Sequence, residues 1–363
     1  MIAKKFYLPP YLKALSVMLF IIVLIFFLII GKSLLIPLFM GGFFAVLFTP
    51  MTNWLESKKV PRILSTILAL LLMIALVGGL IAFVIGNVTS FTRDFENVSG
   101  RIQQVAKEID MWTMQTIGIN ENLDEKATSG YLLSLLDQNS KTISGFLLNA
   151  VGSLTGVILI PLFMFFFLLY RDHLTQVIIS IYRDKDSALV RLRITGLRKV
   201  ILNYIVGVGK VMVILAILNI SAYTALGIKH AIFFGVIGAI LNIIPYVGPF
   251  FGVLLPIIYS FLTKDSLFYP IAILVIYQII QMVEGNYLTP KIVGGNVNLN
   301  AFVTLLGLLV GGTIWGVAGM ILAIPVLAIL REIFDLNEST KPFALLLGEE
   351  KTEPKPDKNE IAE

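Results

Sequence analysis

Residues 231–262 read AIFFGVIGAILNIIPYVGPFFGVLLPIIYSFL, a run that contains no charged side chain. About 20 apolar residues suffice for a helix to cross a bilayer, so this run is too long for one span. Pro245 and Pro249 near its middle each lack an amide donor and block continuation of a helix, and Gly248 permits a left-handed turn. The run therefore predicts two apolar helices separated by a break.

Carbonyl groups freed by such a break are tolerated at membrane depth only where they are buried in protein or line a wet cavity. Broken helices of this kind form the ion and substrate sites of transporters. We therefore predict that the break binds a substrate or ion, and that a structural kink is the alternative. The predicted site residues here are Asn242, Pro245, Tyr246, Gly248 and Pro249.

The composition agrees with a membrane location. The chain has 363 residues, of which 57% are hydrophobic and only 14% charged, against about 25% in soluble domains. The net charge of +5 comes from loops beside apolar runs, which favours membrane topology over a nucleic-acid partner. Cysteine is absent, so the chain has neither disulfides nor thiolate metal sites. We predict an all-α polytopic membrane protein.

Seven further apolar runs have the length of a membrane span or more, and a short turn at Gly31–Ser33 separates the first two. They are 12–30, 34–54, 64–85, 150–170, 204–226, 267–283 and 302–330. We expect the last run to be interrupted at Gly311 and Gly312, forming a second broken hairpin. The glycines at steps of four in this run, with Gly319, predict close helix packing.

Lysine and arginine cluster before the first span, after the second, and between the fourth and fifth. The positive-inside rule then places the N-terminus in the cytoplasm. The predicted organisation is 1–87 with helices one to three, 88–146 as an extracytoplasmic amphipathic helical segment, 147–203 with the fourth span and a basic cytoplasmic loop, 204–335 as the C-terminal transport region, and 336–363 as a cytoplasmic, partly disordered tail.

The extracytoplasmic segment carries apolar residues at alternating steps of three and four. They are Val88, Phe91, Phe95, Val98, Ile102, Val105, Ile109 and Trp112. This heptad pattern predicts that the third span continues into a long amphipathic helix. The apolar seam serves either a local helical hairpin or a contact between subunits.

Signatures of catalysis are missing from the sequence. Neither a P-loop nor an H-E-x-x-H motif occurs, and nothing resembles a nucleophile elbow. The only two histidines, His173 and His230, lie beside membrane ends and are expected to be solvated. We expect neither enzymatic activity nor a cofactor, beyond coupling to sodium or protons.

Glu284 directly follows the run 267–283 and precedes an uncharged, turn-rich segment. We hypothesise that it is a proton- or cation-coupling acid, with Lys210 or Lys291 as its counter-charge. Lys210 lies about two turns inside the fifth span, within reach of snorkelling. Simple interfacial charges are the alternative.

Three motifs resemble the autoinducer-2 exporter family. They are Asn242-Ile-Ile-Pro-Tyr-Val-Gly-Pro249, Glu284-Gly-Asn286-x-x-x-Pro290-Lys291-Ile-Val-Gly294, and the glycine-rich stretch from Gly311 to Pro325. The ending of the fourth span, Pro161 to Asp172, also resembles this family. The resemblance adds Asn286, Pro290, Lys291 and Gly294 to the predicted site.

This family resemblance implies about eight membrane segments and a bacterial-type permease of the inner membrane. Some members export autoinducer-2, and others exchange sodium or lithium for protons. It also implies a homo-oligomer, with a pentamer as one option. We predict a secondary transporter of a small polar metabolite or a monovalent cation. A channel and a non-transporting scaffold are the alternatives.

Overall fold

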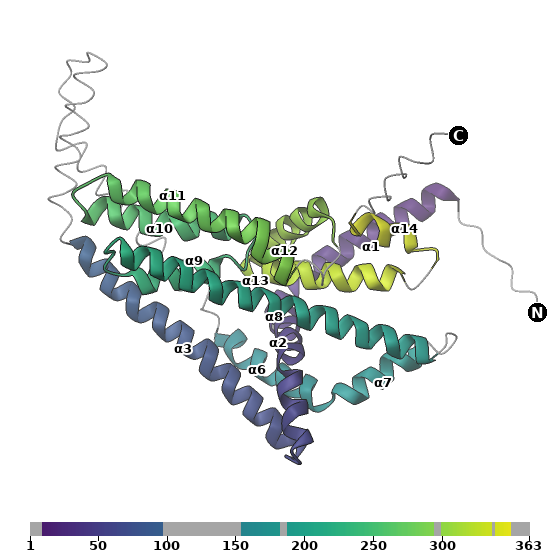
Figure 1. The fold of residues 1–363 in the computed structure, drawn as a ribbon. Coiled ribbons are helices and arrows are strands. Elements are labelled where there is room, and N and C mark those ends of the chain that lie inside the picture. Colours follow the sequence, from purple (N-terminus) through teal and green to yellow (C-terminus); the bar gives the residue numbers. More distant parts are fainter. Residues whose placement is uncertain (1–8, 97–153, 182–186, 294–298, 336–337, 350–363) are drawn as a thin grey trace, which may run out of the picture. The chain divides into compact units, whose positions relative to one another are not determined.

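The computed structural model describes residues 9–96, 154–181, 187–293, 299–335 and 338–349, and every regular element in these ranges is helical (Figure 1). Within them, six helices are long and apolar enough to cross a membrane, or seven if the bent pair α6–α7 forms one span. The predicted all-α polytopic architecture is confirmed. The predicted count of about eight spans stays a prediction.

The described helices form two compact units that alternate along the chain, with residues 9–66, 154–181, 187–201, 299–335 and 338–349 in the first and 67–96 and 202–293 in the second. The helices are α1 (Pro10–Ile30), α2 (Lys32–Ser57), α3 (Arg62–Glu96), α6 (Leu154–Leu169), α7 (Arg171–Ile181), α8 (Ser187–Ala225), α9 (Ala231–Leu241), α10 (Val247–Thr263), α11 (Phe268–Val283), the π-helix η1 (Glu284–Leu288), α12 (Thr289–Ile292), α13 (Ala301–Asp335) and α14 (Lys341–Leu347). Helices α3 and α8 each begin in the first unit and continue into the second.

In the first unit, α1 passes into α2 with only Gly31 outside a helix, a shorter connection than the expected turn over Gly31–Ser33. The amide of Gly31 still donates to the carbonyl of Phe27, so the helical hydrogen-bond pattern of α1 extends to Gly31. Pro37 and Pro50 lie inside α2.

Helices α2 and α6 approach each other closely at Gly41. A side chain there would start 2.7 Å from Cβ of Phe163 and 3.0 Å from the carbonyl oxygen of Ile160. Such a distance leaves no room for a methyl group, so glycine sets the separation of the two helices.

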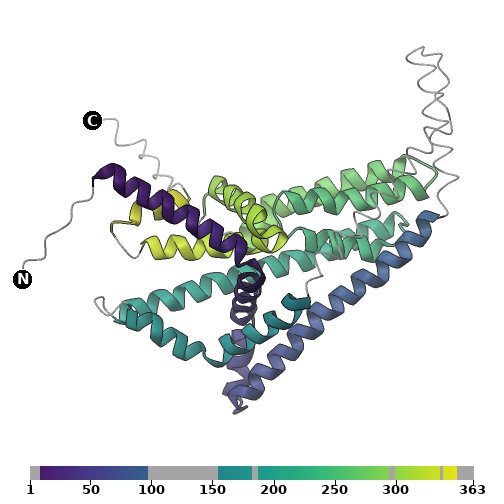
Figure 2. The ribbon, with the colours of Figure 1, turned by 180° about the vertical axis from the view of Figure 1, so that it is seen from behind.

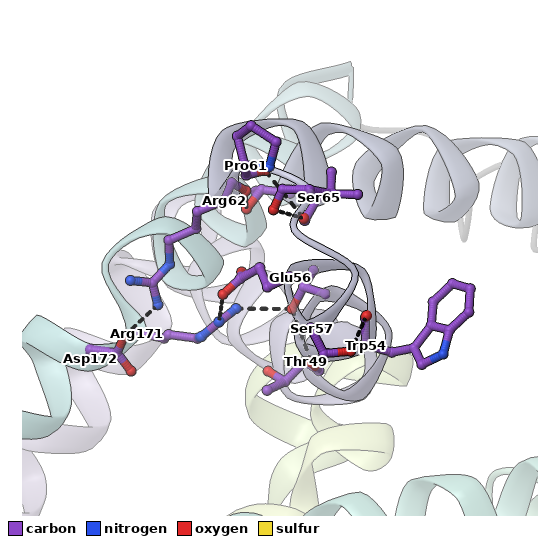
Figure 3. Close-up of polar contacts among 12 residues, drawn as sticks. Thr49, Trp54, Glu56, Ser57, Pro61, Arg62, Ser65, Arg171 and Asp172 are labelled. Atoms are coloured by element: carbon purple, nitrogen blue, oxygen red, sulfur yellow. Dashed lines mark hydrogen bonds and ion pairs between the residues drawn. The ribbon is translucent and has the colours of Figure 1, made fainter.

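At the end of the predicted fourth span the chain turns by 69° between α6 and α7. Arg171 starts α7 and its guanidinium lies 2.6 Å from a carboxylate oxygen of Glu56 and 3.0 Å from Oγ1 of Thr52. Arg62 pairs with Asp172 at 2.8 Å, and Figure 3 shows both arginines reaching their carboxylates. These bonds tie α7 to α2 and to the start of α3.

The basic connection predicted between the fourth and fifth spans, residues 171–203, contains helical residues in α7 and at the beginning of α8, and its cytoplasmic location stays a prediction. Apolar residues recur between the polar ones in α7, which suits a helix with one apolar face.

The expected interruption of α13 at Gly311 and Gly312 is also misplaced, because the non-helical residue is Gly316, with φ 60° and ψ −139°. Only glycine adopts this backbone readily. The two arms fold back on each other: a Cβ on Gly311 would lie 2.5 Å from the carbonyl oxygen of Gly319, and one on Gly307 would lie 2.4 Å from Leu327. The predicted hairpin and the close packing of its glycines are thus confirmed.

Helix α1 packs beside this hairpin, as Figure 2 shows for the dark purple α1 and the yellow end of α13. The indole nitrogen of Trp315 donates to the carbonyl of Leu28 at 2.9 Å, and the ring of Trp315 contacts Phe39. The C-terminal α14 packs on α13, and the amide of Asn300 donates to Leu347.

The second unit has a buried apolar core drawn from α8, α9, α10 and α11, with Phe83 and Val84 of α3 packed against it. Helix α3 continues to Glu96, so the predicted extension of the third span is confirmed up to that residue. The side chains of the predicted heptad seam, from Val88 to Trp112, lie outside the described part of the structure.

Candidate functional site

The break predicted in the run 231–262 separates α9 from α10 at residues Asn242 to Tyr246. Asn242 ends α9, and its amide donates to the carbonyl of Gly238. Pro245 lies within the break and cannot donate. Tyr246 has φ +66°, one of two non-glycine residues with positive φ in the described chain. A strained residue of this kind often marks a functional position.

Gly248 does not make the expected left-handed turn, because that backbone belongs to Tyr246. Gly248 is instead required by a close approach, since a Cβ there would lie 1.8 Å from the carbonyl oxygen of Leu241. Pro249 lies in the first turn of α10, where a missing amide hydrogen costs no helical bond.

The two arms of the α9–α10 hairpin meet at Gly238 and Gly252. A Cβ on Gly252 would lie 3.1 Å from Cα of Gly238 and 3.1 Å from the hydroxyl oxygen of Tyr277 in α11. Backbone of both arms therefore lies directly beside a polar group of the third helix.

Glu284 directly follows α11 (Phe268–Val283), as expected, but helical structure continues beyond it. The helical span runs from Phe268 to Ile292, and Glu284 lies inside it, at the start of the π-helical turn Glu284–Leu288. The wider turn lies directly before Pro290, whose ring cannot continue a regular α-helix. The expected turn-rich segment is thus a continuation of the helix.

The carboxylate of Glu284 accepts a hydrogen bond from the hydroxyl of Thr289 across this π turn. The side-chain amide of Asn286 donates to the carbonyl of Met282 at 2.9 Å. Lys291 donates to the hydroxyl of Tyr287 at 3.0 Å and lies over its ring. Glu284 is partly buried, whereas Asn286, Tyr287 and Lys291 are exposed.

Lys210 lies on α8 in a shallow groove of about 500 Å³ that Ile292 of α12 also lines. Close contact of α8 and α12 continues at Gly207, where a Cβ would lie 3.0 Å from the carbonyl oxygen of Ile292. Among the described side chains, no ion pair joins Glu284 to Lys210 or to Lys291. A counter-charge for Glu284 therefore stays a prediction.

Sequence reasoning missed two polar residues on the same helix. The side-chain amide of Gln281 donates to the hydroxyl of Tyr277 at 2.9 Å, and Tyr277 is buried. Tyr277, Gln281 and Glu284 follow at helical spacing, so they form a polar stripe on an otherwise apolar span. Polar residues at steps of four and three from Tyr277 to Glu284, across the end of the run 267–283, were the available signal.

The break and the Glu284 turn belong to the same unit, and α10 packs directly on α11. Among the described residues, no hydrogen bond or ion pair connects the predicted residues of the break to those of the turn. Gly294, the last predicted site residue, lies outside the described ranges.

A family model described as AI-2E family transporter matches residues 15–338. The protein belongs to the AI-2E transporter family. The recognition made from the sequence motifs is thereby confirmed.

Curated bacterial relatives match this AI-2E family protein over most of its length. One from Bacillus subtilis (strain 168), named "Putative transport protein YueF", is 26% identical over 322 residues, covering 85% of each chain. The "AI-2 transport protein TqsA" of Escherichia coli (strain K12) is 22% identical over 326 residues, covering 88% of this chain and 90% of its own. Family membership and the apolar helices together establish a multi-pass membrane transporter.

Proposed function

We propose that this AI-2E family member is a secondary transporter whose site comprises the α9–α10 break and the Glu284 turn. Its cargo is a small polar metabolite or signal, or a monovalent cation exchanged for protons. Alternating access arises from movement of the broken hairpins around the site.

The position of Glu284 carries this proposal. An ionisable residue inside a membrane span is costly and is retained where a solute, ion or proton passes. Glu284 is only partly buried, its carboxylate accepts a hydrogen bond from Thr289, and no salt bridge among the described side chains joins it to Lys210 or Lys291, so it can exchange a proton or accept a cation. π-helical turns are frequent at functional sites.

The α9–α10 break supplies the second part of the site. The exposed Tyr246 and the partly buried Asn242 border it, and Pro245 within it interrupts the regular amide-to-carbonyl pattern of a helix. Backbone carbonyls and an amide side chain can bind a hydroxyl group or a monovalent cation.

The relatives support transport as the activity and leave the cargo open. TqsA is named for AI-2, which makes autoinducer-2 one cargo to test here. We further propose a bacterial inner-membrane location with a cytoplasmic N-terminus. We also propose homo-oligomeric assembly, with a pentamer as one option, which cross-linking in native membranes would measure.

Reconstitution of the purified chain in proteoliposomes tests the function. We expect saturable uptake, counterflow, and dependence on an imposed pH or sodium gradient, with autoinducer-2, sodium and protons screened in parallel. Conductance without saturation or counterflow would indicate a pore instead. Absence of both flux and conductance would favour a scaffold and overturn the proposal.

A further inference from the structure

Two polar groups in the core of the second unit have no hydrogen-bond partner among the described residues. They are Oδ1 of Asn219 and the hydroxyl of Tyr223, one helical turn apart on α8. Each residue is only 1% exposed. A buried polar group without a partner carries the full cost of losing water, so each of these two groups requires an explanation, and a bound hydroxyl is one that satisfies both.

The register of α8 against α11 places these groups beside the polar stripe. Leu215 and Ile280 belong to one buried cluster, and Tyr223 and Ile273 belong to another. The order of the clusters along α8 is the reverse of their order along α11, so the two helices run antiparallel. Asn219, midway between Leu215 and Tyr223, therefore lies at the level of Tyr277.

Backbone atoms of the α9–α10 hairpin pack directly against this region, because glycines stand at the points of contact. Gly252 leaves space for the hydroxyl of Tyr277, and Gly235 meets the backbone of α8 at Ile220, next to Asn219. Tyr277 accepts from Gln281, so its own hydroxyl hydrogen remains available to donate.

We propose that Asn219 and Tyr223, with Tyr277, form an occluded site for a hydroxyl-bearing neutral ligand, either water or a hydroxyl group of the transported solute. The assignment of the ligand to the transported solute rests on the proposed transport function. A hydroxyl donates to Oδ1 of Asn219 and accepts from Tyr223 at the same time.

Other ligands fit this site less well. A hard cation takes about six or more oxygen ligands, whereas two unsatisfied oxygens are present, and the described residues hold no cluster of three acidic or histidine side chains. An anion would meet the acceptor oxygen of Asn219, and no buried side chain in the described part of the chain carries a positive charge. The neutral hydroxyl satisfies both groups without burying a charge.

Radiolytic hydroxyl-radical footprinting of the full chain in lipid nanodiscs tests the site, because radicals form from bound water. Tyr223 should be oxidised several-fold faster than Phe234, an aromatic residue of the same core that is also 1% exposed. Oxidation of Tyr223 no faster than that of Phe234 would show a dry site and overturn the proposal.

Two variants sharpen this test. Asn219→Leu should lower the oxidation rate of Tyr223 to that of Phe234. If the leucine variant fails to fold, Tyr223→Phe, which removes one oxygen, should lower the oxidation rate at position 223 to the same level. Ser221→Ala, an exposed hydroxyl on the same helix, should change nothing. Unchanged oxidation in folded Asn219→Leu would also contradict the site.

Added erythritol, a neutral polyol, distinguishes the two sources of the hydroxyl. Protection of Tyr223 relative to Tyr11, which is 70% exposed and lies outside the proposed site, would assign the site to a solute hydroxyl, and lack of protection would assign it to water alone. Footprinting does not depend on transport, so a negative footprinting result can be distinguished from a negative transport assay.

Discussion

The guanidinium of Arg171 lies 2.6 Å from the carboxylate of Glu56, although 115 residues separate them. The Arg171 side chain is 10% exposed and that of Glu56 26%, whereas in the neighbouring pair Arg62 and Asp172 are 31% and 68% exposed. Burial should therefore make the first pair important for the α6–α7 bend and the second nearly dispensable.

Arg171→Ala should lower the free energy of unfolding by on the order of 3 kcal/mol, because it leaves Glu56 poorly solvated and unpaired. Arg62→Ala should cost less than about 1 kcal/mol, since an exposed pair gains little. Denaturant unfolding in detergent micelles measures both. Equal losses in the two variants would show that burial does not separate these pairs.

The α13 hairpin should be detectable by cross-linking, and the chain has no native cysteine to interfere. Gly307→Cys combined with Leu327→Cys should form a disulfide under mild oxidation, because a Cβ on Gly307 contacts Leu327. In a straight helix these positions would lie about 30 Å apart. A gel-shift or mass measurement detects the link, and an unlinked pair beside unlinked single-cysteine controls would contradict the hairpin.

Tyr246→Gly should leave stability unchanged or raise it, but reduce transport. Removing the strain of a non-glycine residue at positive φ should raise the free energy of unfolding by about 1–2 kcal/mol. The greater backbone entropy of glycine in the unfolded chain lowers it by about 0.5–1 kcal/mol. Flux should fall because the exposed Tyr246 side chain borders the break. Thermal unfolding and proteoliposome flux give the two readings.

Lys59→Gly is the matched control, since Lys59 has φ 65° and lies outside the site. It should show a similar change in stability with full flux. If Tyr246→Gly also kept full flux, the tyrosine side chain would have no role in transport.

Glu284→Gln should reduce gradient-driven flux by roughly tenfold and remove its pH dependence, because the amide can neither titrate nor hold a cation. Thr289→Val should weaken flux less, since it removes only the hydrogen bond to Glu284. Asp265→Asn, an exposed acid in the same unit, should behave as wild type. Intact transport and pH dependence in Glu284→Gln would exclude a coupling role.

The sequence by itself determined the membrane environment, the helical class and the family. Hydropathy is a property of each side chain, and a membrane span must satisfy its backbone internally, so a long uncharged run predicts a helix without knowledge of its neighbours. The α9–α10 break followed from Pro245 for a similarly local reason, because a missing amide hydrogen prevents a regular helix wherever it lies.

Tertiary structure decided which residues of these helices meet. Several glycines in 302–330 could have formed the turn, and packing of the two arms selected Gly316. Glu284 was expected beyond a helix end, but the segment continues through a π turn and places it inside the span. Asn219 and Tyr277 gained importance only through burial, since the cost of an unpaired polar group depends on the helices that exclude water from it.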